Sequence, residues 1–443
     1  MTGQKLLSTV ILIAMLVTTA QLACGQTDAP LQWHPPFPDT AASTSLQSDS
    51  LSLDQVLLQV AKSNATLTAN RWRNLRFEEL IRQARLRPNP ELSFDAEQVA
   101  GNYPGFSQSE LTVQASQTLE LGGKRSAREK VAQTDFAIAE LEGKLTAFEI
   151  FADTKERFFA LLYAQHKVIL KQQSHQLVTE LAEAARFRVE QGAALVSEQL
   201  LGELTVKRAW LGVTTVRTEL ANARRDLIAL WNGSLSDSIA VSDEFETPPT
   251  LPTVNHVREL ARGNAESVRL RKELERSSTQ LRLEQSNAKP DLSLSGGFKR
   301  LQGDRTNTLL FGVSLPLPLF NRNQGAVASL QAQQREQEAL TVSSDIAAVA
   351  EAEQILTTLN QLVANHRTVE DVILPEYERV FASLKNAYSS GRLSYPDLLE
   401  GERNLNDTRF QLNDLKLDIQ LEVIALERLV GLPWNDIVKN VKE

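Results

Sequence analysis

The feature that most constrains the fold of this chain is an internal repeat, because one series of landmarks recurs in the same order about 200 residues later. The period is far longer than that of a solenoid repeat, so the pattern indicates a duplicated half. The matched landmarks are Pro90–Ser93 with Pro290–Ser293, Leu119–Arg125 with Leu317–Asn323, Gly192 with Gly391, and Trp231-Asn232 with Val430-Gly431.

Each half is expected to contain a helix, two strands, a very long helix, a turn and a return helix. The first half covers residues 51–247 and the second covers 253–434, with a tail at 435–443. The joint between them is the proline-rich segment Thr247–Pro252.

The strands are predicted near 91–121 and near 291–317 from alternation of apolar and polar residues. Leu111, Val113 and Ala115 alternate with polar neighbours, and a period of two is typical of a strand with two different faces. The alternation continues in the second half at Leu309, Phe311, Val313 and Leu315.

The long helices are predicted at 124–191 and 324–390, with return helices at 195–231 and 394–430. The chain has no proline between Pro104 and Pro248. The apolar positions of these stretches recur at steps of three, four and seven, as in a coiled coil. At 1.5 Å per residue the first helix would extend for roughly 100 Å. A soluble coiled-coil rod would explain these helices, but it leaves the four strands without a purpose.

Four strands are too few to close a barrel, which needs about eight. An open sheet in a bilayer would leave backbone groups unpaired in hydrocarbon, at several kcal/mol for each group. Strands that span a membrane must therefore join strands of other copies. Three chains would supply twelve strands and enclose an aqueous lumen. The fold class expected is mainly α, with tandem long hairpins forming a trimeric α-barrel beside a shared twelve-stranded transmembrane β-barrel.

The N-terminus is typical of a secretory signal: Lys5 precedes the apolar run Leu6–Val17, and small residues follow. We expect a signal peptide at 1–25 and an extended leader at 26–50, the alternative being a membrane anchor that stays. No later segment offers the roughly 20 apolar residues of a spanning helix. A net charge of −8 gives no support to nucleic-acid binding.

Cys24 is the only cysteine, and it lies just after the apolar run. This position resembles a lipoprotein cleavage site, which would make 1–23 the signal and leave the cysteine acylated. Gln21 stands where such sites usually carry an aliphatic residue. Ordinary cleavage after Ala20 or Gly25 is the alternative.

The whole pattern resembles the TolC-type outer-membrane factors, from about Ser52 to Trp434. The resemblance is carried by the segments Leu119–Arg125 and Leu317–Gly325, and by the turns Arg188–Gly192 and Tyr388–Gly391. The first two segments are most similar to the branch that serves heavy-metal exporters, including the cobalt–zinc–cadmium resistance type.

The resemblance implies a homotrimer in the outer membrane, in contact with its lipid and with a large periplasmic part. It implies a periplasmic adaptor, an inner-membrane pump of the resistance-nodulation-division type, and no catalysis or cofactor. The function expected is a passive efflux conduit, with heavy-metal cations as one cargo. A drug-efflux or type I secretion duct of the same fold is an alternative. A periplasmic coiled-coil adaptor or tether is another, although it would have one hairpin rather than two.

The turns at Gly192 and Gly391 are expected at the periplasmic tips, since glycine permits the left-handed conformation that ends a helix. The resemblance implies that these tips dock the adaptor. The alternative is that they are hairpin turns only. Arg188, one turn before Gly192, could cap the helix C-terminus or contact a partner.

Just beyond the second turn lie Asp397, Glu400 and Glu402. In a three-fold assembly an inward carboxylate becomes a ring that favours cations. Asp397 and Glu400 are the candidates for such an entrance ring. Ordinary acidic enrichment in the first turn of a helix is the alternative.

The strand-to-helix junctions contain Gly122 and Gly123 in the first half, and Asn321 and Asn323 in the second. The Gly-Gly-Lys-Arg run lacks the rest of a phosphate-binding loop, so a tight turn explains it better. No catalytic motif is found.

We predict no metal site. His166 and His366 occupy matching places, but each has leucine neighbours, Leu162 and Leu170 for the first and Leu362 and Leu374 for the second. Both are therefore interpreted as packed or hydrogen-bonded histidines. The only methionines, Met1 and Met15, lie in the signal.

Overall fold

The structure is a computed structural model that describes residues 50–100, 105–231, 233, 239–242, 245 and 250–439. The predicted signal peptide, nearly all of the predicted leader, and Cys24 lie outside the described residues.

Each half begins with a helix that is divided in two by an asparagine. In the first half α2 (Leu53–Ser63) ends at Asn64, whose side chain then accepts hydrogen bonds from the first turn of α3 (Ala65–Ala84). In the second half α6 (Val254–Ala261) and α7 (Ala265–Asn287) are separated by Asn264, which caps α7 in the same way. Asparagine is among the strongest N-cap residues, so the two halves share this break.

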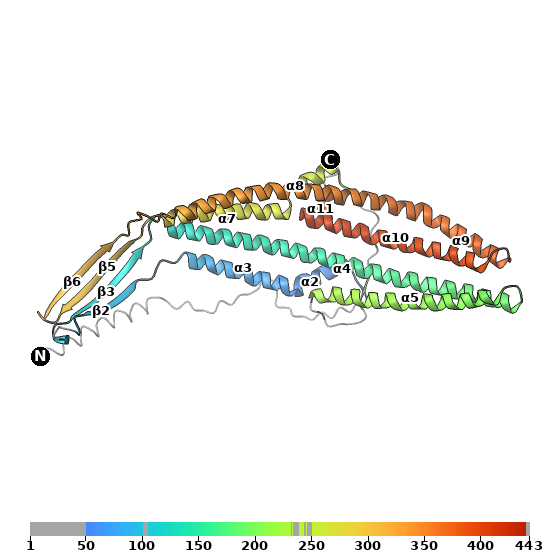
Figure 1. The fold of residues 1–443 in the computed structure, drawn as a ribbon, viewed down its shortest axis with the longest axis horizontal. Helices are drawn as coiled ribbons and strands as arrows, with labels where there is room; N and C mark the ends of the chain where they lie inside the picture. The colour runs from blue at the N-terminus through green and yellow to red at the C-terminus, as the bar shows by residue number, and fades with distance from the viewer. Residues whose placement is uncertain are drawn as a thin grey trace. The chain divides into compact units, whose positions relative to one another are not determined.

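The four strands form one antiparallel sheet in the order β2-β3-β5-β6 (Figure 1). The strands are β2 (Glu91–Glu97), β3 (Glu110–Leu119), β5 (Leu292–Leu301) and β6 (Thr306–Ser314). A 3-10 turn, η1 (Gly105–Ser107), lies between β2 and β3. The two central strands come from different halves, so β3 and β5 join the halves, and β2 and β6 form the outer edges.

One face of this sheet is apolar and the other is polar. The register places Phe94 opposite Val113, Val113 opposite Phe298, and Phe298 opposite Leu309, so apolar residues share one face. Several are highly exposed, with Phe94 at 70% and Phe311 at 86%. A face of this kind needs an apolar environment.

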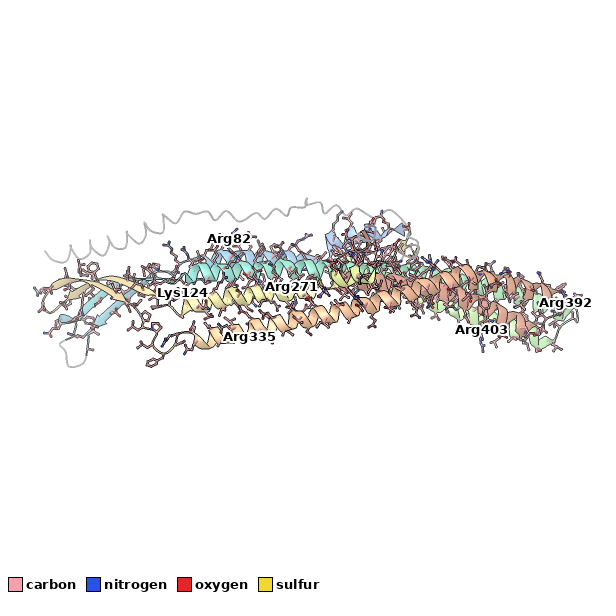
Figure 2. The ribbon with its side chains drawn as sticks, turned by 90° about the horizontal axis from the view of Figure 1, so that it is seen from above. Arg82, Lys124, Arg271, Arg335, Arg392 and Arg403 are labelled. Atoms are coloured by element: carbon pink, nitrogen blue, oxygen red, sulfur yellow. The ribbon has the colours of Figure 1, made fainter. Side chains whose placement is uncertain are left out.

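Two helical hairpins extend from the sheet. The first consists of α4 (Lys124–Glu190) and α5 (Val196–Ile228), followed by the 3-10 turn η2 (Ala229–Trp231). The second consists of α8 (Gln324–Thr368), the π-helical segment η3 (Val369–Ile373), α9 (Leu374–Ser389) and α10 (Tyr395–Val430), and α11 (Trp434–Lys439) follows. Figure 2 shows Lys124 at the sheet end of the helices and Arg392 at the opposite end.

The long helix predicted at 324–390 is helical from Gln324 to Ser389, but the π-helical segment η3 interrupts its α-helical geometry. Pro375 follows η3 and stands in the first turn of α9. Proline has no N–H to donate and its ring clashes with the carbonyl four residues earlier. A π-helical turn is one way in which a long helix accommodates such a break.

Four buried clusters among the described residues hold the helices together, one of them between α8 and α10 around Leu359 and Ile419. The first packs α2 and η2 on α4, with the parallel pair β1 (Ser50–Leu51) and β4 (Ala240–Val241) beside it. Its counterpart packs α6 and α11 on α8 and α10 around Leu356 and Leu426. The third lies near the turns and includes Leu181, Tyr388 and Tyr395.

The structure corrects the alignment of the two halves at the junctions. Ser93 pairs with Gln114, and Ser293 pairs with Ser314, so the hairpins match at a separation of 200 residues. The helices that follow begin at Lys124 and Gln324, again 200 apart. The sequence match of Leu119 with Leu317 is thus displaced by two residues, and Leu119 corresponds to Leu319.

Among the described residues, no helix has a stretch that is both long enough and apolar enough to cross a membrane.

Candidate functional site

The turn after α4 ends the helix in a Schellman motif. Gly192 has φ of 70° and its N–H donates to the Val189 carbonyl over 2.9 Å. The N–H of Ala193 donates to the Arg188 carbonyl over 2.8 Å. This pair of bonds satisfies two of the last helical carbonyls, and it requires the left-handed conformation that glycine adopts without strain.

The turn after α9 has the same geometry. Gly391 has φ of 75° and donates to the Tyr388 carbonyl over 3.0 Å, while Arg392 donates to the Ala387 carbonyl over 2.9 Å. The two predicted tip glycines therefore end their helices identically.

Arg188 joins the two tips. Its Nη1 donates to the Tyr388 carbonyl over 2.9 Å, in the last turn of α9, and its Nη2 donates to the Ala193 carbonyl over 3.3 Å. The guanidinium carbon lies 4.4 Å from the centre of the Tyr388 ring, within cation–π range. Arg188 thus caps the C-terminus of a helix in the other hairpin rather than the end of its own.

Behind this contact lie two buried tyrosines. Tyr388 is 2% exposed and donates to Glu198 over 3.3 Å, and its ring lies 5.6 Å from that of Tyr395. Burial raises the pKa of both phenols, that of Tyr395 to about 12. The pair stays neutral and gives the tip a firm core.

The two candidate ring residues, Asp397 and Glu400, differ in the contacts that they make. Asp397 accepts a hydrogen bond from the Ser394 hydroxyl over 2.5 Å, and that hydroxyl accepts in turn from the Asp397 N–H. Asp397 therefore takes part in capping α10. Glu400 is exposed one turn further along.

Glu402 points into the helices instead of out of them. It is 7% exposed, accepts from the Ser174 hydroxyl of α4 over 3.0 Å, and accepts from the Asn406 amide. Burial raises the pKa of this carboxyl, and the bond from Ser174 offsets part of the rise.

The first strand-to-helix junction is built on two glycines in the left-handed region. Gly122 has φ of 73°, and a Cβ there would lie 2.5 Å from the Lys289 side chain. Asp291 ties the junction together, because it accepts from the Leu121 N–H over 3.0 Å and pairs with Lys124 over 2.8 Å.

The second junction reaches the same start of a helix without glycine. Asn323 has φ of 58° and its amide donates to Glu284 over 2.9 Å. Asn321 accepts a bond from the Asn323 N–H over 3.0 Å. Asparagine tolerates the left-handed region better than other side chains do, so both junctions turn alike.

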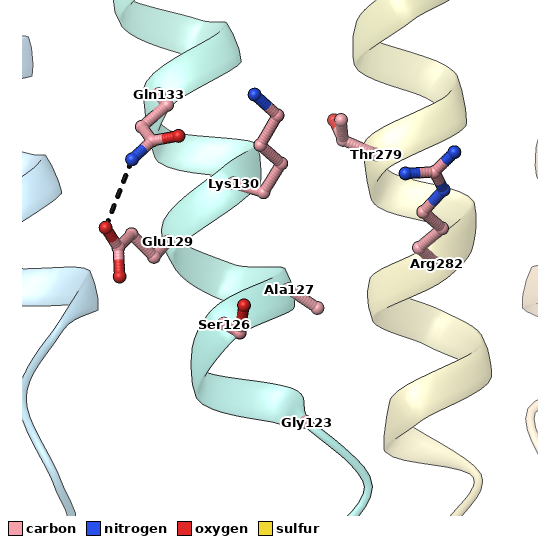
Figure 3. Close-up of a pocket in the computed structure, with 8 residues that line it drawn as sticks. All are labelled: Gly123, Ser126, Ala127, Glu129, Lys130, Gln133, Thr279 and Arg282. Carbon is pink, nitrogen blue, oxygen red and sulfur yellow. Dashed lines mark hydrogen bonds between the residues drawn. The ribbon is translucent and has the colours of Figure 1, made fainter.

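A polar pocket of about 420 Å³ opens beside the start of α4, between α4 and α7 (Figure 3). Lys130 of α4 and Arg282 of α7 line it from opposite sides, so its basic groups come from both halves. The lining residues are Gly123, Ser126, Ala127, Glu129, Lys130, Gln133, Thr279 and Arg282.

The two histidines have different surroundings. The His166 ring lies edge-on to Phe245, with centroids 5.5 Å apart. His366 is 3% exposed, and its Nδ1 lies 3.5 Å from a Glu370 oxygen without the geometry of a hydrogen bond. The interpretation from leucine neighbours overlooked Glu370, four residues after His366. Burial lowers the pKa of His366 despite Glu370.

Within the part of the chain that the structure describes, no three His, Cys, Asp or Glu side chains group so as to hold a metal ion.

Sequence reasoning missed the partners across the hairpins. Tyr388 lies 200 residues after Arg188, so the repeat already marked it as the matching position. The pairing of Ser174 with Glu402 had no comparable signal, because it depends on how α4 and α10 face each other.

A family model described as outer membrane efflux protein matches residues 56–233 and 258–432, which together are most of the chain. The two matched stretches correspond to the two halves.

Two curated relatives come from Cupriavidus metallidurans. The cobalt-zinc-cadmium resistance protein CzcC is 28% identical over 424 residues, which is 95% of this chain and 98% of that protein. The nickel and cobalt resistance protein CnrC is 24% identical and matches 73% of this chain and 74% of its own length. Among solved structures, the CmeC outer membrane channel of Campylobacter jejuni superposes with a TM-score of 0.69 at 16% identity, covering 93% of each chain.

Proposed function

The chain belongs to the outer membrane efflux protein family, and we propose that it is the exit duct of a heavy-metal cation exporter. As a family member it is an outer-membrane efflux channel with a large helical part in the periplasm. The alternative of a periplasmic adaptor or tether is set aside by the family match to both halves.

The main observation in support of the proposed cargo is the match to CzcC, which spans 95% of this chain. The matched relative CnrC is also a metal-resistance protein by name. Cobalt, zinc, cadmium and nickel ions are the cations that these names supply.

A homotrimer follows from the need to pair the outer edges of the sheet. Among the described residues, the β2 and β6 edges have no strand paired to them, and the apolar face of the sheet is exposed. Three copies would close the sheet into a twelve-stranded barrel and continue its wall with the helical hairpins. The duct itself supplies no energy, so transport is driven by an inner-membrane pump, which we propose to be of the resistance-nodulation-division type.

The helical tips are the proposed docking site for the periplasmic adaptor. Gly192 and Gly391 give both tips the same shape, and Arg188 holds one to the other. A rigid paired tip suits recognition by a helical partner, since little conformational freedom is lost on binding.

We propose Glu400 as the stronger candidate for an acidic ring at the entrance, since Asp397 already caps α10. A ring of carboxylates would favour cations at the mouth. Replacement of Glu400 by Gln should lower cation conductance in single-channel recordings, with Asp397→Asn as the matched comparison. Equal conductance of the Glu400→Gln and wild-type channels would remove Glu400 from this role.

The experiment for the cargo is deletion of the gene in its host, followed by growth in graded zinc, cobalt, cadmium and nickel. Loss of the duct should raise cellular metal content and lower tolerance to at least one of these ions. Complementation with the wild-type gene provides the control.

Panels of hydrophobic antibiotics and analysis of secreted proteins accompany the metal series. Unchanged metal tolerance with new antibiotic sensitivity would assign the chain to drug efflux. Unchanged tolerance with loss of a secreted protein would assign it to type I secretion.

A further inference from the structure

The two outer edges of the sheet lie in different halves, and no other strand in the described part of the chain pairs with either of them (Figure 1). We infer that β2 of a second copy pairs with the β6 edge in one defined register, in which Phe94 faces Leu317 and Ala96 faces Leu315. The inference rests on the proposed trimer and adds the alignment of its intermolecular seam.

The template for this seam is already present inside the chain. The pairing of β3 with β5 joins the first half to the second, just as a β6–β2 pairing would join the second half of one copy to the first half of the next. In the internal seam Leu119 faces Leu292, Gln117 faces Leu294, and Gln114 faces Gly297.

The repeat transfers this register to the outer edges. Both hairpins have the same internal register at a separation of 200 residues, so β3 positions map onto β6 and β5 positions map onto β2. The internal pair of Gln114 with Gly297 thus corresponds to a pair of Ser314 with Glu97 between two copies. The pairs that follow along the ladder are Leu315 with Ala96, Leu317 with Phe94, and Leu319 with Leu92.

The hydrogen-bonding groups of both edges point the right way for these pairs. The Gln302 N–H donates to the Ser109 carbonyl over 3.0 Å, which identifies the odd-numbered residues of β3 as those that bond to β5. Backbone groups of successive residues point to opposite edges of a strand. The outward groups are therefore those of even-numbered β2 residues and odd-numbered β6 residues, which the register places opposite each other.

Two prolines are compatible with this seam. They also prevent the pairing of β5 with β6 from extending further. Pro316 and Pro318 are even-numbered, so their nitrogen atoms face β5, where the ladder ends at Ser293 and Ser314. Because proline has no N–H, it ends a ladder on the side that its nitrogen faces. Leu315 and Leu317 keep their outward N–H groups for the neighbouring copy.

The side chains agree with the pairing as well. Phe94 and Leu317 are 70% and 71% exposed, and Leu315 is 46% exposed. In the proposed register all three lie on the apolar face that the rest of the sheet shares. A displacement by one residue would turn them to the polar face, so only displacements by two remain as competitors.

Disulfide cross-linking in the membrane tests the register. Glu97→Cys with Ser314→Cys places two cysteines directly opposite each other across the seam. Within one chain Glu97 lies level with Thr306, eight residues before Ser314, and β3 and β5 lie between them, so the two residues are too far apart for a disulfide. Any disulfide therefore links different copies and should give covalent trimers on non-reducing gels.

Two control variants keep Ser314→Cys and move the other cysteine to Asp95 or Val99. Asp95 displaces the pair by about 7 Å along the strand, which exceeds disulfide geometry, and Val99 lies two residues beyond the end of β2. Each single-cysteine variant controls for reactions of Cys24. We expect at least a tenfold higher cross-linked fraction for the Glu97 pair than for either displaced pair.

Light scattering of the reduced variants in detergent separates the two ideas under test. Trimers that cross-link best through the Asp95 or Val99 pair, or through no pair, would overturn the register and leave the trimer standing. Particles of monomer mass would overturn the proposed trimer and the seam together.

Discussion

The first half of the chain reaches its tip in one uninterrupted helix, α4, whereas the second half needs α8, the π-helical turn η3 and α9. The junctions differ as well, with two glycines in the first half and Arg322-Asn323 in the second. Yet both paths begin and turn at matched places. The shared path is therefore set by the ends of the helices, and the residues between the ends have diverged.

The buried contacts of the two halves have diverged furthest. Lys155 of α4 pairs with Glu427 of α10 over 2.7 Å, and the Glu427 side chain is 3% exposed. The matching positions in the repeat are Ile355 and Ile228, which are apolar. The ion pair joins the two halves, whereas its repeat equivalents are apolar residues in two separate clusters, Ile228 with α2 and Ile355 with α6.

The largest expected effect comes from breaking this ion pair. Lys155→Met should destabilise the helical part by about 3–5 kcal/mol, because it leaves a buried carboxylate without its cation. Thermal unfolding followed by circular dichroism in detergent would measure the fall in Tm.

The double variant Lys155→Ile with Glu427→Ile introduces the residues found at the matching repeat positions, and it should recover most of this loss because no buried carboxylate remains. It leaves the Trp434 N–H without the Glu427 oxygen that it contacts at 2.6 Å, at about 1–3 kcal/mol. A double variant no more stable than Lys155→Met would show that the halves are not interchangeable here.

The junctions should give the next largest effect. Gly122→Val should destabilise by about 2–3 kcal/mol, since a side chain at positive φ costs about 1–2 kcal/mol and would also displace Lys289. Gly123→Asn copies Asn323 at an open position and should change stability by less than about 1 kcal/mol. Equal Tm losses in the two variants would contradict this account of the junctions.

The smallest effect concerns pH. Burial raises the pKa of Glu402 in the folded protein, so its contribution to stability is full below the pKa of the unfolded chain and is lost as pH rises through the folded pKa. Glu402→Gln should remove this dependence and gain about 1 kcal/mol at pH 8.

The matching residue, Glu203, is exposed and accepts from Gln199, so Glu203→Gln serves as the control. Tm measured from pH 4 to pH 8 should diverge from wild type for the Glu402 variant alone. Parallel profiles for all three proteins would exclude a role for the buried carboxyl.

The sequence was sufficient for the features that depend on local periodicity. Alternation at Leu111, Val113 and Ala115 marked a strand, and the absence of proline before Pro248 allowed α4 to be one helix. Glycine marked both turns for a conformational reason that applies to any chain. The family resemblance and the fold class are confirmed by the comparisons.

The features that were missed depend on conformation or on distant neighbours. Pro375 was visible within the predicted helix 324–390 and was the available signal for η3. The junction alignment failed because Leu-x-Leu recurs two residues early, while the true match of Gly123 with Asn323 lies in their shared positive φ. Contacts such as that of Ser174 with Glu402 depend on which faces of α4 and α10 meet, and these helices are far apart in the sequence. The adaptor-docking role of Arg188, Gly192 and Gly391 stays a prediction, as does the acidic ring.

The fusion of both halves in one chain also bears on how the duct is assembled. The β3–β5 seam forms as the chain folds, at an effective local concentration that dilution cannot lower. In the proposed ring only every second seam awaits an encounter between molecules. Duplication therefore halves the number of molecules that must meet, and assembly depends less steeply on how much protein reaches the membrane.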